Sequence, residues 1–252
     1  MRPRYRTIVE IRRHLALAGA SGVGHVAIAL PARSTNWVRD RWRAVIAGVV
    51  GLTVGVLVLG NGAILAASIA ARVAVGQSGA PRAIPGIENF RAVDDHVWRG
   101  GSPSDDGYRA LAALGVTTVV DLRSEHDPDD DGLLRGLGIT LVRIPMGDGR
   151  APTVAEVDTA LAAIDESEGR VFVHCAAGVG RTGSVVGLYL LRNGAASRSG
   201  ALARNLAVGP PSLEQIAFVL GAGNGTPHQP NDAVVAFSRF LDAPRLLWNR
   251  VT

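Results

Sequence analysis

The sequence predicts an α/β domain, a central sheet flanked by helices, preceded by a single transmembrane helix. Three observations lead to this prediction. From residue 86 onward, short β-branched and apolar runs alternate with segments that carry helix caps. From about residue 199 the pattern is helical only. Before this domain stands a long stretch without any ionisable side chain.

The N-terminal segment, residues 1–43, is rich in arginine. Residues 1–72 hold 10 Arg against 2 acidic residues, whereas residues 73–252 hold 16 Arg against 20. A basic segment next to an apolar run is typical of membrane topology rather than of nucleic-acid binding, so we expect no nucleic-acid partner. The chain contains no Lys, which excludes a Schiff-base lysine and a Walker-type phosphate ligand.

Residues 44–71 form the apolar run, 28 residues long. A bilayer core needs roughly 20 apolar residues, so this run predicts a helix that contacts the lipid bilayer. The arginines before it place the N-terminus in the cytoplasm and the C-terminal domain outside it, as a single-pass membrane protein. A buried core helix and a cleaved signal peptide are the alternatives. The weaker apolar stretch 15–32 is not counted as a second span, because that would put the Arg-rich loop outside.

Residues 72–85 read as a linker, with Gly and Pro concentrated in 77–85, and residues 86–252 read as the folded domain. Its first expected element is an edge strand over 93–98. Ser102 as N-cap and Pro103 at the first helical position then predict a helix to Leu114. The β-branched run 116–122 predicts a buried strand.

The rest of the domain continues this alternation. Residues 130–137 predict a short helix and 140–144 a strand. Thr153 and Glu156 have the spacing of a capping box, which predicts a helix to Glu166. The remaining expected elements are a strand over 171–173 and helices over 181–192, 199–208, 212–220 and 232–241.

Cys175, the one cysteine of the chain, lies two residues beyond the expected strand 171–173. Ligands of open α/β sheets bind at the carboxyl ends of strands. The glycines that follow allow the loop to curl and present successive N–H groups to an anion at the start of a helix. The predicted phosphate-binding residues are Ala176, Ala177, Gly178, Val179, Gly180 and Arg181.

The same loop suits a sulfur nucleophile. A helix N-terminus and a neighbouring cation both favour the thiolate over the thiol. The guanidinium of Arg181 can bind two phosphate oxygens at once. A thiolate at the base of this cradle would be placed to attack phosphorus.

The segment from His174 to Gly183 resembles the signature of the cysteine-based protein tyrosine phosphatase superfamily, His-Cys-x-x-Gly-x-x-Arg-Thr/Ser-Gly. It matches at His174, Cys175, Gly178, Arg181, Thr182 and Gly183. Segments 89–93, 97–103 and 119–123 are similar to the N-terminal part of small bacterial dual-specificity-like phosphatases, some of them periplasmic or membrane-associated. The resemblance covers about residues 86–208 and implies a protein tyrosine phosphatase-like fold.

The resemblance also implies catalytic roles. Cys175 would be the nucleophile, Arg181 would bind the phosphoryl group, Thr182 would stabilise the thiolate and His174 would orient the loop. The family's general acid lies on a loop some tens of residues before the cysteine, which fits Asp148, between two glycines. An ordinary turn aspartate is the alternative at that position, and the acidic cluster 127–131 is the competing candidate. Asp121 and Arg123 are expected to form a structural ion pair.

The sequence therefore predicts a phosphomonoester hydrolase of the protein tyrosine or dual-specificity type that acts through a phosphocysteine. No cofactor and no metal are expected, because the histidines lack ligand spacing. With no loop cation besides Arg181, we expect a phosphotyrosine-containing protein or another phosphomonoester as substrate rather than an inositol lipid. The alternatives are a phosphoinositide phosphatase, a rhodanese-like sulfur transferase and a non-catalytic membrane protein that binds phospho-ligands.

Overall fold

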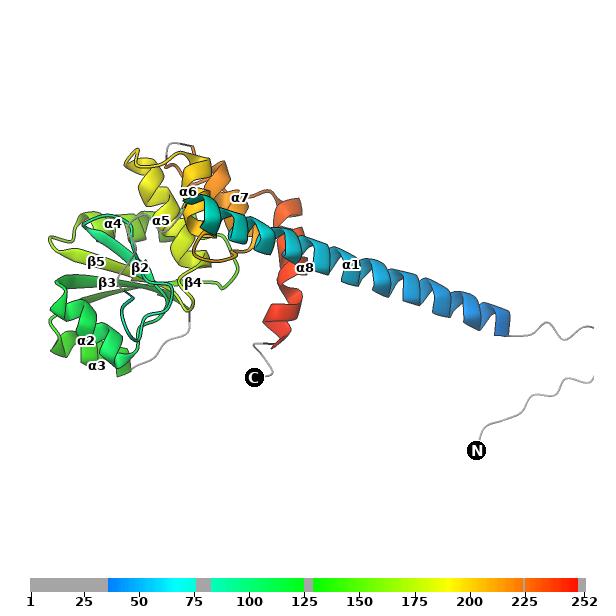
Figure 1. The fold of residues 1–252 in the computed structure, drawn as a ribbon, viewed down its shortest axis with the longest axis horizontal. Helices are drawn as coiled ribbons and strands as arrows, with labels where there is room; N and C mark the ends of the chain where they lie inside the picture. The colour runs from blue at the N-terminus through cyan, green and yellow to red at the C-terminus, as the bar shows by residue number, and fades with distance from the viewer. Residues whose placement is uncertain (1–35, 76–82, 125–128, 224, 249–252) are drawn as a thin grey trace, which may run out of the picture. The chain divides into compact units, whose positions relative to one another are not determined.

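The computed structural model describes residues 36–75, 83–124, 129–223 and 225–248 (Figure 1). The stretch 15–32, half of the expected linker (residues 76–82) and the first two residues of the acidic cluster lie outside these ranges. The elements are α1 (Asn36–Val75), β1 (Arg91–Ala92), β2 (Val97–Gly100), α2 (Asp105–Ala113), β3 (Val116–Arg123), α3 (Asp129–Gly136), β4 (Thr140–Met146), α4 (Val154–Asp165), β5 (Arg170–His174), α5 (Gly180–Arg192), α6 (Arg198–Leu206), α7 (Leu213–Gly221) and α8 (Asp232–Trp248).

One five-stranded sheet forms the centre of the domain, in the order β1-β2-β5-β3-β4. All neighbouring strands are parallel except β1 and β2. Figure 1 shows α2 and α3 on one face of the sheet and α4 and α5 on the other. Apolar side chains fill both interfaces, in two clusters of buried residues. The expected α/β architecture with a central sheet flanked by helices is confirmed.

The edge of the sheet differs from the expectation. A single strand was expected over 93–98, but the chain turns there and forms a short antiparallel pair, β1 with β2. Asp94 causes the turn: its Oδ1 accepts hydrogen bonds from the amides of His96 (2.9 Å) and Val97 (2.7 Å). Aspartate side chains compete with strand ladders in this way. As a result β2 lies inside the sheet, paired with β5.

Two helix starts test the capping predictions. The capping box of Thr153 and Glu156 is confirmed at the start of α4, with both hydrogen bonds present. Ser102 is not the N-cap of α2; Ser104 is, and its side chain accepts from the amide of Gly107. The amide of Ser102 instead donates to the carbonyl of Ala176 at 2.9 Å, which ties Ser102 to the cysteine loop.

The apolar run 44–71 lies within α1, a helix of 40 residues. Most of its large apolar side chains are exposed, as are both of its tryptophans, Trp37 and Trp42. Among the described residues, α1 is the one helix long and apolar enough to cross a membrane, with a mean hydropathy of 2.2. Membrane crossing itself remains a prediction.

The C-terminal turns of α1 contact the α/β domain. The hydroxyl of Ser68, which is buried, donates to the carbonyl of Leu206 at 2.6 Å. The guanidinium of Arg72 donates to the carbonyl of Val208 at 2.8 Å. Protein therefore covers one side of the last turns of the apolar run, near its expected end at residue 71.

Candidate active site

Cys175 lies directly after the central strand β5, at the carboxyl edge of the sheet. Its thiol is free and only 3% of the residue is exposed. Five residues on, α5 has begun, and its first turn contains Arg181. The parallel register of β2 and β3 with β5 brings their carboxyl ends alongside, as expected of a ligand site in this fold.

Donors from the surrounding structure hold the carbonyl oxygens of the cysteine loop. The acceptors and their donors are Cys175 with His174 Nδ1 (3.4 Å), Ala176 with the Ser102 amide (2.9 Å), Ala177 with Asn89 Nδ2 (2.9 Å), Gly178 with Arg99 Nη2 (2.6 Å), Val179 with the Gly183 amide (3.0 Å) and Gly180 with Ser184 Oγ (3.2 Å). A planar peptide carries its N–H opposite its C=O. Carbonyls held outward therefore turn the following amides toward the other side of the loop.

The loop amides themselves remain available. Within the described residues, the amides of 176–179 donate to no other protein group. Gly178 allows the curl: its φ is +71°, and a Cβ there would lie 2.2 Å from the backbone of Gly100. The loop thus has the form predicted for it, a ring of amides at a helix N-terminus that can bind an anion.

Arg181 and Asp148 meet across this loop. Arg181 is 2% exposed, its Nη1 donates to the carbonyl of Met146 (3.2 Å), and its Nη2 lies 3.5 Å from Asp148 Oδ1. Asp148 follows β4 and is 37% exposed at its side chain. The structure therefore brings the expected acid next to the expected phosphate-binding arginine, with one face toward solvent.

His174 is the last residue of β5 and directly precedes the cysteine. The residue is fully buried, and its Nε2 lies 3.5 Å from the hydroxyl of Tyr108. Burial lowers the pKa of His174 to about 4, against a smaller opposing effect of Asp121. The imidazole is therefore neutral at neutral pH, which suits a group that orients the loop rather than a charged catalyst.

Asp121 and Arg123 form the structural ion pair that the sequence predicted, at 2.9 Å. Burial raises the pKa of Asp121, but hydrogen bonds from Arg123 outweigh it and leave the pKa below its ordinary value. Arg123 also binds Asp130 (2.6 Å) and Ser102 Oγ (2.7 Å). Asp131 pairs with Arg143. Asp130 and Asp131, which belong to the competing acidic cluster 127–131, thus pair with Arg123 and Arg143 and not with Arg181.

Thr182 follows Arg181 in the first turn of α5. Its hydroxyl is buried and has no hydrogen-bond partner in the described structure, so the bond to sulfur that the resemblance implies is not formed here. The role of Thr182 remains a prediction. Among the described residues no group of three His, Cys, Asp or Glu side chains could hold a metal ion.

Sequence reasoning missed three residues that shape the loop. Asn89 has a left-handed φ of 53°, which asparagine tolerates, and its side chain holds the carbonyl of Ala177. Arg99 lies behind the loop, where it binds two loop carbonyls and Asn205. An arginine inside a short, buried strand was the available signal for Arg99. Asn205, from a helix far along the chain, carried no local signal.

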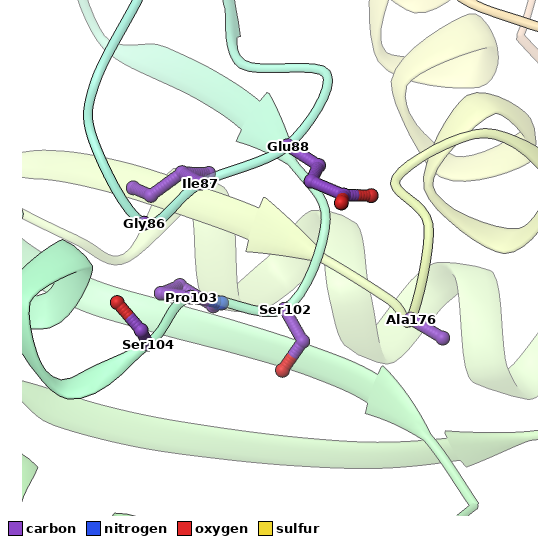
Figure 2. A pocket seen from close by; sticks show the side chains of 7 residues that line it. All are labelled: Gly86, Ile87, Glu88, Ser102, Pro103, Ser104 and Ala176. Carbon is purple, nitrogen blue, oxygen red and sulfur yellow. The ribbon is translucent and has the colours of Figure 1, made fainter.

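A pocket of about 590 Å³ opens beside the start of the loop (Figure 2). Three segments line it: residues 86–88, residues 102–104 and Ala176, which follows the cysteine directly. The lining contains two serines and one charged side chain, that of Glu88. Through Ala176 the pocket borders the cysteine loop.

Comparisons with known proteins agree with this geometry. Residues 86–220 match a family described as "DSP-PTPase phosphatase fused to NAD+ Kinase". The fold, the loop and this match define a cysteine-based phosphatase of the dual-specificity class. Because the match covers more than half of the chain, the chain belongs to that family.

Individual relatives are more distant. The chain is 35% identical to NAD kinase 2, chloroplastic, from Arabidopsis thaliana over 97 residues, 35% of this chain and 10% of that protein. It is 29% identical to inositol diphosphatase DSP5 of the same plant over 107 residues, 39% of this chain and 52% of that protein. The core catalytic domain of the PP-IP phosphatase SIW14 from S. cerevisiae is 20% identical, with a TM-score of 0.49 over 65% of this chain and 96% of that one. The chain thus spans about a tenth of the NAD kinase and about half of the inositol diphosphatase.

Proposed function

We propose that this protein hydrolyses phosphotyrosine or another phosphomonoester through a phosphocysteine formed on Cys175. The observation that carries the proposal is the meeting of three groups around one anion-binding loop: a buried thiol, a buried guanidinium and a half-exposed carboxyl. Arg181 and Asp148 approach within 3.5 Å. The loop between them and Cys175 presents amides that no described protein group occupies.

The mechanism has two steps. Cys175 Sγ attacks phosphorus in line, the bond to the leaving oxygen breaks, and Asp148 donates a proton to that oxygen. Arg181 and the loop amides stabilise the charge on the three equatorial phosphoryl oxygens. Asp148, now a carboxylate, takes a proton from water as the water attacks the phosphocysteine. Inorganic phosphate leaves, and the thiolate and the protonated acid are restored.

The pocket supports a phosphomonoester of low additional charge. Glu88 is its charged side chain, and no arginine lines it. A substrate with several phosphates would place further negative charge near this carboxylate, which is unfavourable. A tyrosine ring would instead lie against Ile87 and Pro103, both at the pocket wall. This favours phosphotyrosine-containing protein over phosphoinositides.

An inositol phosphate is the second candidate, supported by the relative named as an inositol diphosphatase. One assay separates the two: kcat/KM measured on p-nitrophenyl phosphate, a phosphotyrosine peptide, a phosphoinositide panel and a diphosphoinositol phosphate. We expect the phosphotyrosine peptide to be preferred. A strong preference for the inositol compounds would reverse the substrate assignment, and absence of turnover on all of them would refute the enzyme proposal in favour of a phospho-ligand binding role.

Helix α1 supports anchoring in a bilayer through residues 44–71. Most of its large apolar side chains are exposed, and protein contacts begin at Asn61, which donates to the carbonyl of Leu241 on α8, and continue in its last turns. By the distribution of arginines, the N-terminus would be cytoplasmic and the catalytic domain extracytoplasmic. A C-terminal alkaline phosphatase fusion should be active and a cytoplasmic-only reporter inactive. An inactive alkaline phosphatase fusion with an active cytoplasmic reporter would show that the catalytic domain is cytoplasmic. Extraction of the chain from membranes by alkaline carbonate would refute the membrane anchor.

A further inference from the structure

Arg99 is a second buried guanidinium, behind the phosphate loop. It lies on β2, opposite Val173 of β5, and is 4% exposed. Its Nη2 donates to the carbonyl of Gly178 (2.6 Å), to Oδ1 of Asn205 (2.9 Å) and, at 3.4 Å, to the carbonyl of Val179. One side chain therefore joins the sheet, the phosphate loop and helix α6.

The charge of Arg99 is not balanced by a carboxylate. Within the described residues no acidic side chain lies within 4 Å of its guanidinium, and its Nε has no hydrogen-bond partner. Burial lowers the pKa of Arg99 to about 10, opposed by the thiolate of Cys175 and assisted by Arg91, so the group is still a cation at neutral pH. A buried cation costs several kcal/mol to desolvate, and here hydrogen bonds to a loop carbonyl and to Asn205 offset part of that cost.

The groups that Arg99 does bind are two loop carbonyls and an amide oxygen. Arg181, the other arginine at the loop, instead lies beside Asp148. His174 is neutral, because burial holds its pKa near 4. Arg91 is a further cation, half-buried on β1, and its guanidinium binds the neighbouring carbonyl of Phe90. Arg99 thus contacts the loop and has no competing carboxylate among the described residues.

We infer that Arg99 is a positioning residue for the proposed reaction: it holds the carbonyls of Gly178 and Val179 outward, so that the amides that follow them point toward the phosphate and the sulfur. Without Arg99 these amides would no longer be fixed, and both the nucleophile and a bound phosphate would lose hydrogen-bond donors. This makes Arg99 act on the reaction through the loop rather than on the reacting atoms. This inference rests on the proposed function of Cys175 and deepens it.

The test uses alkylation of the single cysteine, which needs no turnover. Purified full-length protein is treated with iodoacetamide at pH 6, and labelling is followed by mass spectrometry for wild type, Arg99→Met, Arg99→Lys and Arg91→Met. Alkylation requires the thiolate, so its rate falls as the thiol pKa rises, by up to about tenfold for each unit. We expect slower alkylation in Arg99→Met, because the loop amides no longer stabilise the sulfur anion, a rate near wild type in Arg99→Lys, and no change in the matched control Arg91→Met.

Turnover of p-nitrophenyl phosphate adds a second readout. In Arg99→Met we expect kcat to fall and the pH at which alkylation is half-maximal to rise, with circular dichroism unchanged. If Arg99→Met does not fold, Arg99→Gln replaces it: the shorter side chain keeps a polar group but cannot hold both loop carbonyls, and alkylation should slow while the fold is kept. Wild-type alkylation rates in either folded variant would overturn the inference. Fast alkylation together with no turnover in the wild type would instead refute the proposed function alone.

Discussion

The two sides of the phosphate loop hold similar groups in different surroundings. On the front, Arg181 faces a carboxylate, Asp148, which is partly open to solvent. On the back, Arg99 faces carbonyls and an asparagine in a fully buried layer. The front has the exposure that a substrate and a proton donor require. The back has the rigidity that a fixed ring of amides requires.

This difference indicates that residues on the two sides of the loop have different roles. Front residues are expected to act on the reacting atoms, so their substitution should change kcat with little effect on stability. Back residues act through the loop, so their substitution should change stability or nucleophile state together with rate. The predictions below test this division, beginning with the largest effect.

The variant Asp148→Asn tests the front side of the phosphate loop, where Asp148 lies beside Arg181. Loss of a general acid typically costs 10²–10⁴-fold in rate, and we expect a fall of about that size in kcat on a phosphotyrosine peptide. The fall should be smaller on p-nitrophenyl phosphate, whose leaving group needs less protonation. Steady-state kinetics measure both. Asp131→Asn is the matched control, since Asp131 pairs with Arg143, and equal losses in the two variants would move the acid back to the 127–131 cluster.

His174 lies beneath the loop and should make the fold sensitive to acid. Its folded pKa of about 4 is below the unfolded value near 6.5, so the unfolded chain binds more protons between these pH values. Its contribution is complete above about pH 6.5 and is lost as the pH falls to 4, by roughly 3 kcal/mol. Urea unfolding at pH 7 and pH 4 measures this.

The comparison that isolates His174 is the variant His174→Asn. Asp121, with a pKa below its ordinary value, also destabilises the fold as the pH falls, so part of the acid effect will remain in the variant. We expect the free energy of unfolding to fall less between pH 7 and pH 4 in this variant, by the amount that His174 contributes in the wild type. An undiminished dependence in His174→Asn would show that the histidine is not buried in its neutral form.

Gly183→Ala tests the back of the loop. A Cβ at this position would lie 2.0 Å from Oδ1 of Asn205, which also binds Arg99. Overpacking of this kind costs about 1–3 kcal/mol, and displacement of Asn205 should also lower kcat. In the control Gly132→Ala, the new Cβ meets nothing within 4 Å, and the helix should gain about 0.5–1 kcal/mol. A Gly183→Ala protein as stable and active as wild type would contradict the described packing.

The sequence predicted the front of the loop better than the back. Cys175, Arg181 and the neighbouring glycines lie in one continuous segment, where spacing alone indicates a phosphate site. Asp148 is distant in sequence, and it was chosen because the resemblance implies an acid some tens of residues before the cysteine, on a loop after a strand; its role as the acid stays a prediction. Arg99 and Asn205 come from separate elements, and their meeting depends on the order of strands in the sheet, which no local pattern encodes.

The same reason explains the errors in the fold. The helices and the buried strands followed from caps and apolar runs. The strand expected over 93–98 failed because the Asp94 side chain binds two amides and turns the chain. Ser102 failed as a cap because its hydroxyl accepts a hydrogen bond from Arg123 and its amide donates to the carbonyl of Ala176. Both are contacts distant in sequence that become visible only in the fold.

The most direct measurement is the detection of the covalent intermediate. Wild-type protein mixed with p-nitrophenyl phosphate is quenched in acid within one turnover, digested and analysed by mass spectrometry. We predict one phosphoryl group on the peptide that contains Cys175, and neither that group nor turnover in Cys175→Ser. Steady turnover with no phosphocysteine, or phosphate found on a different residue, would contradict the account.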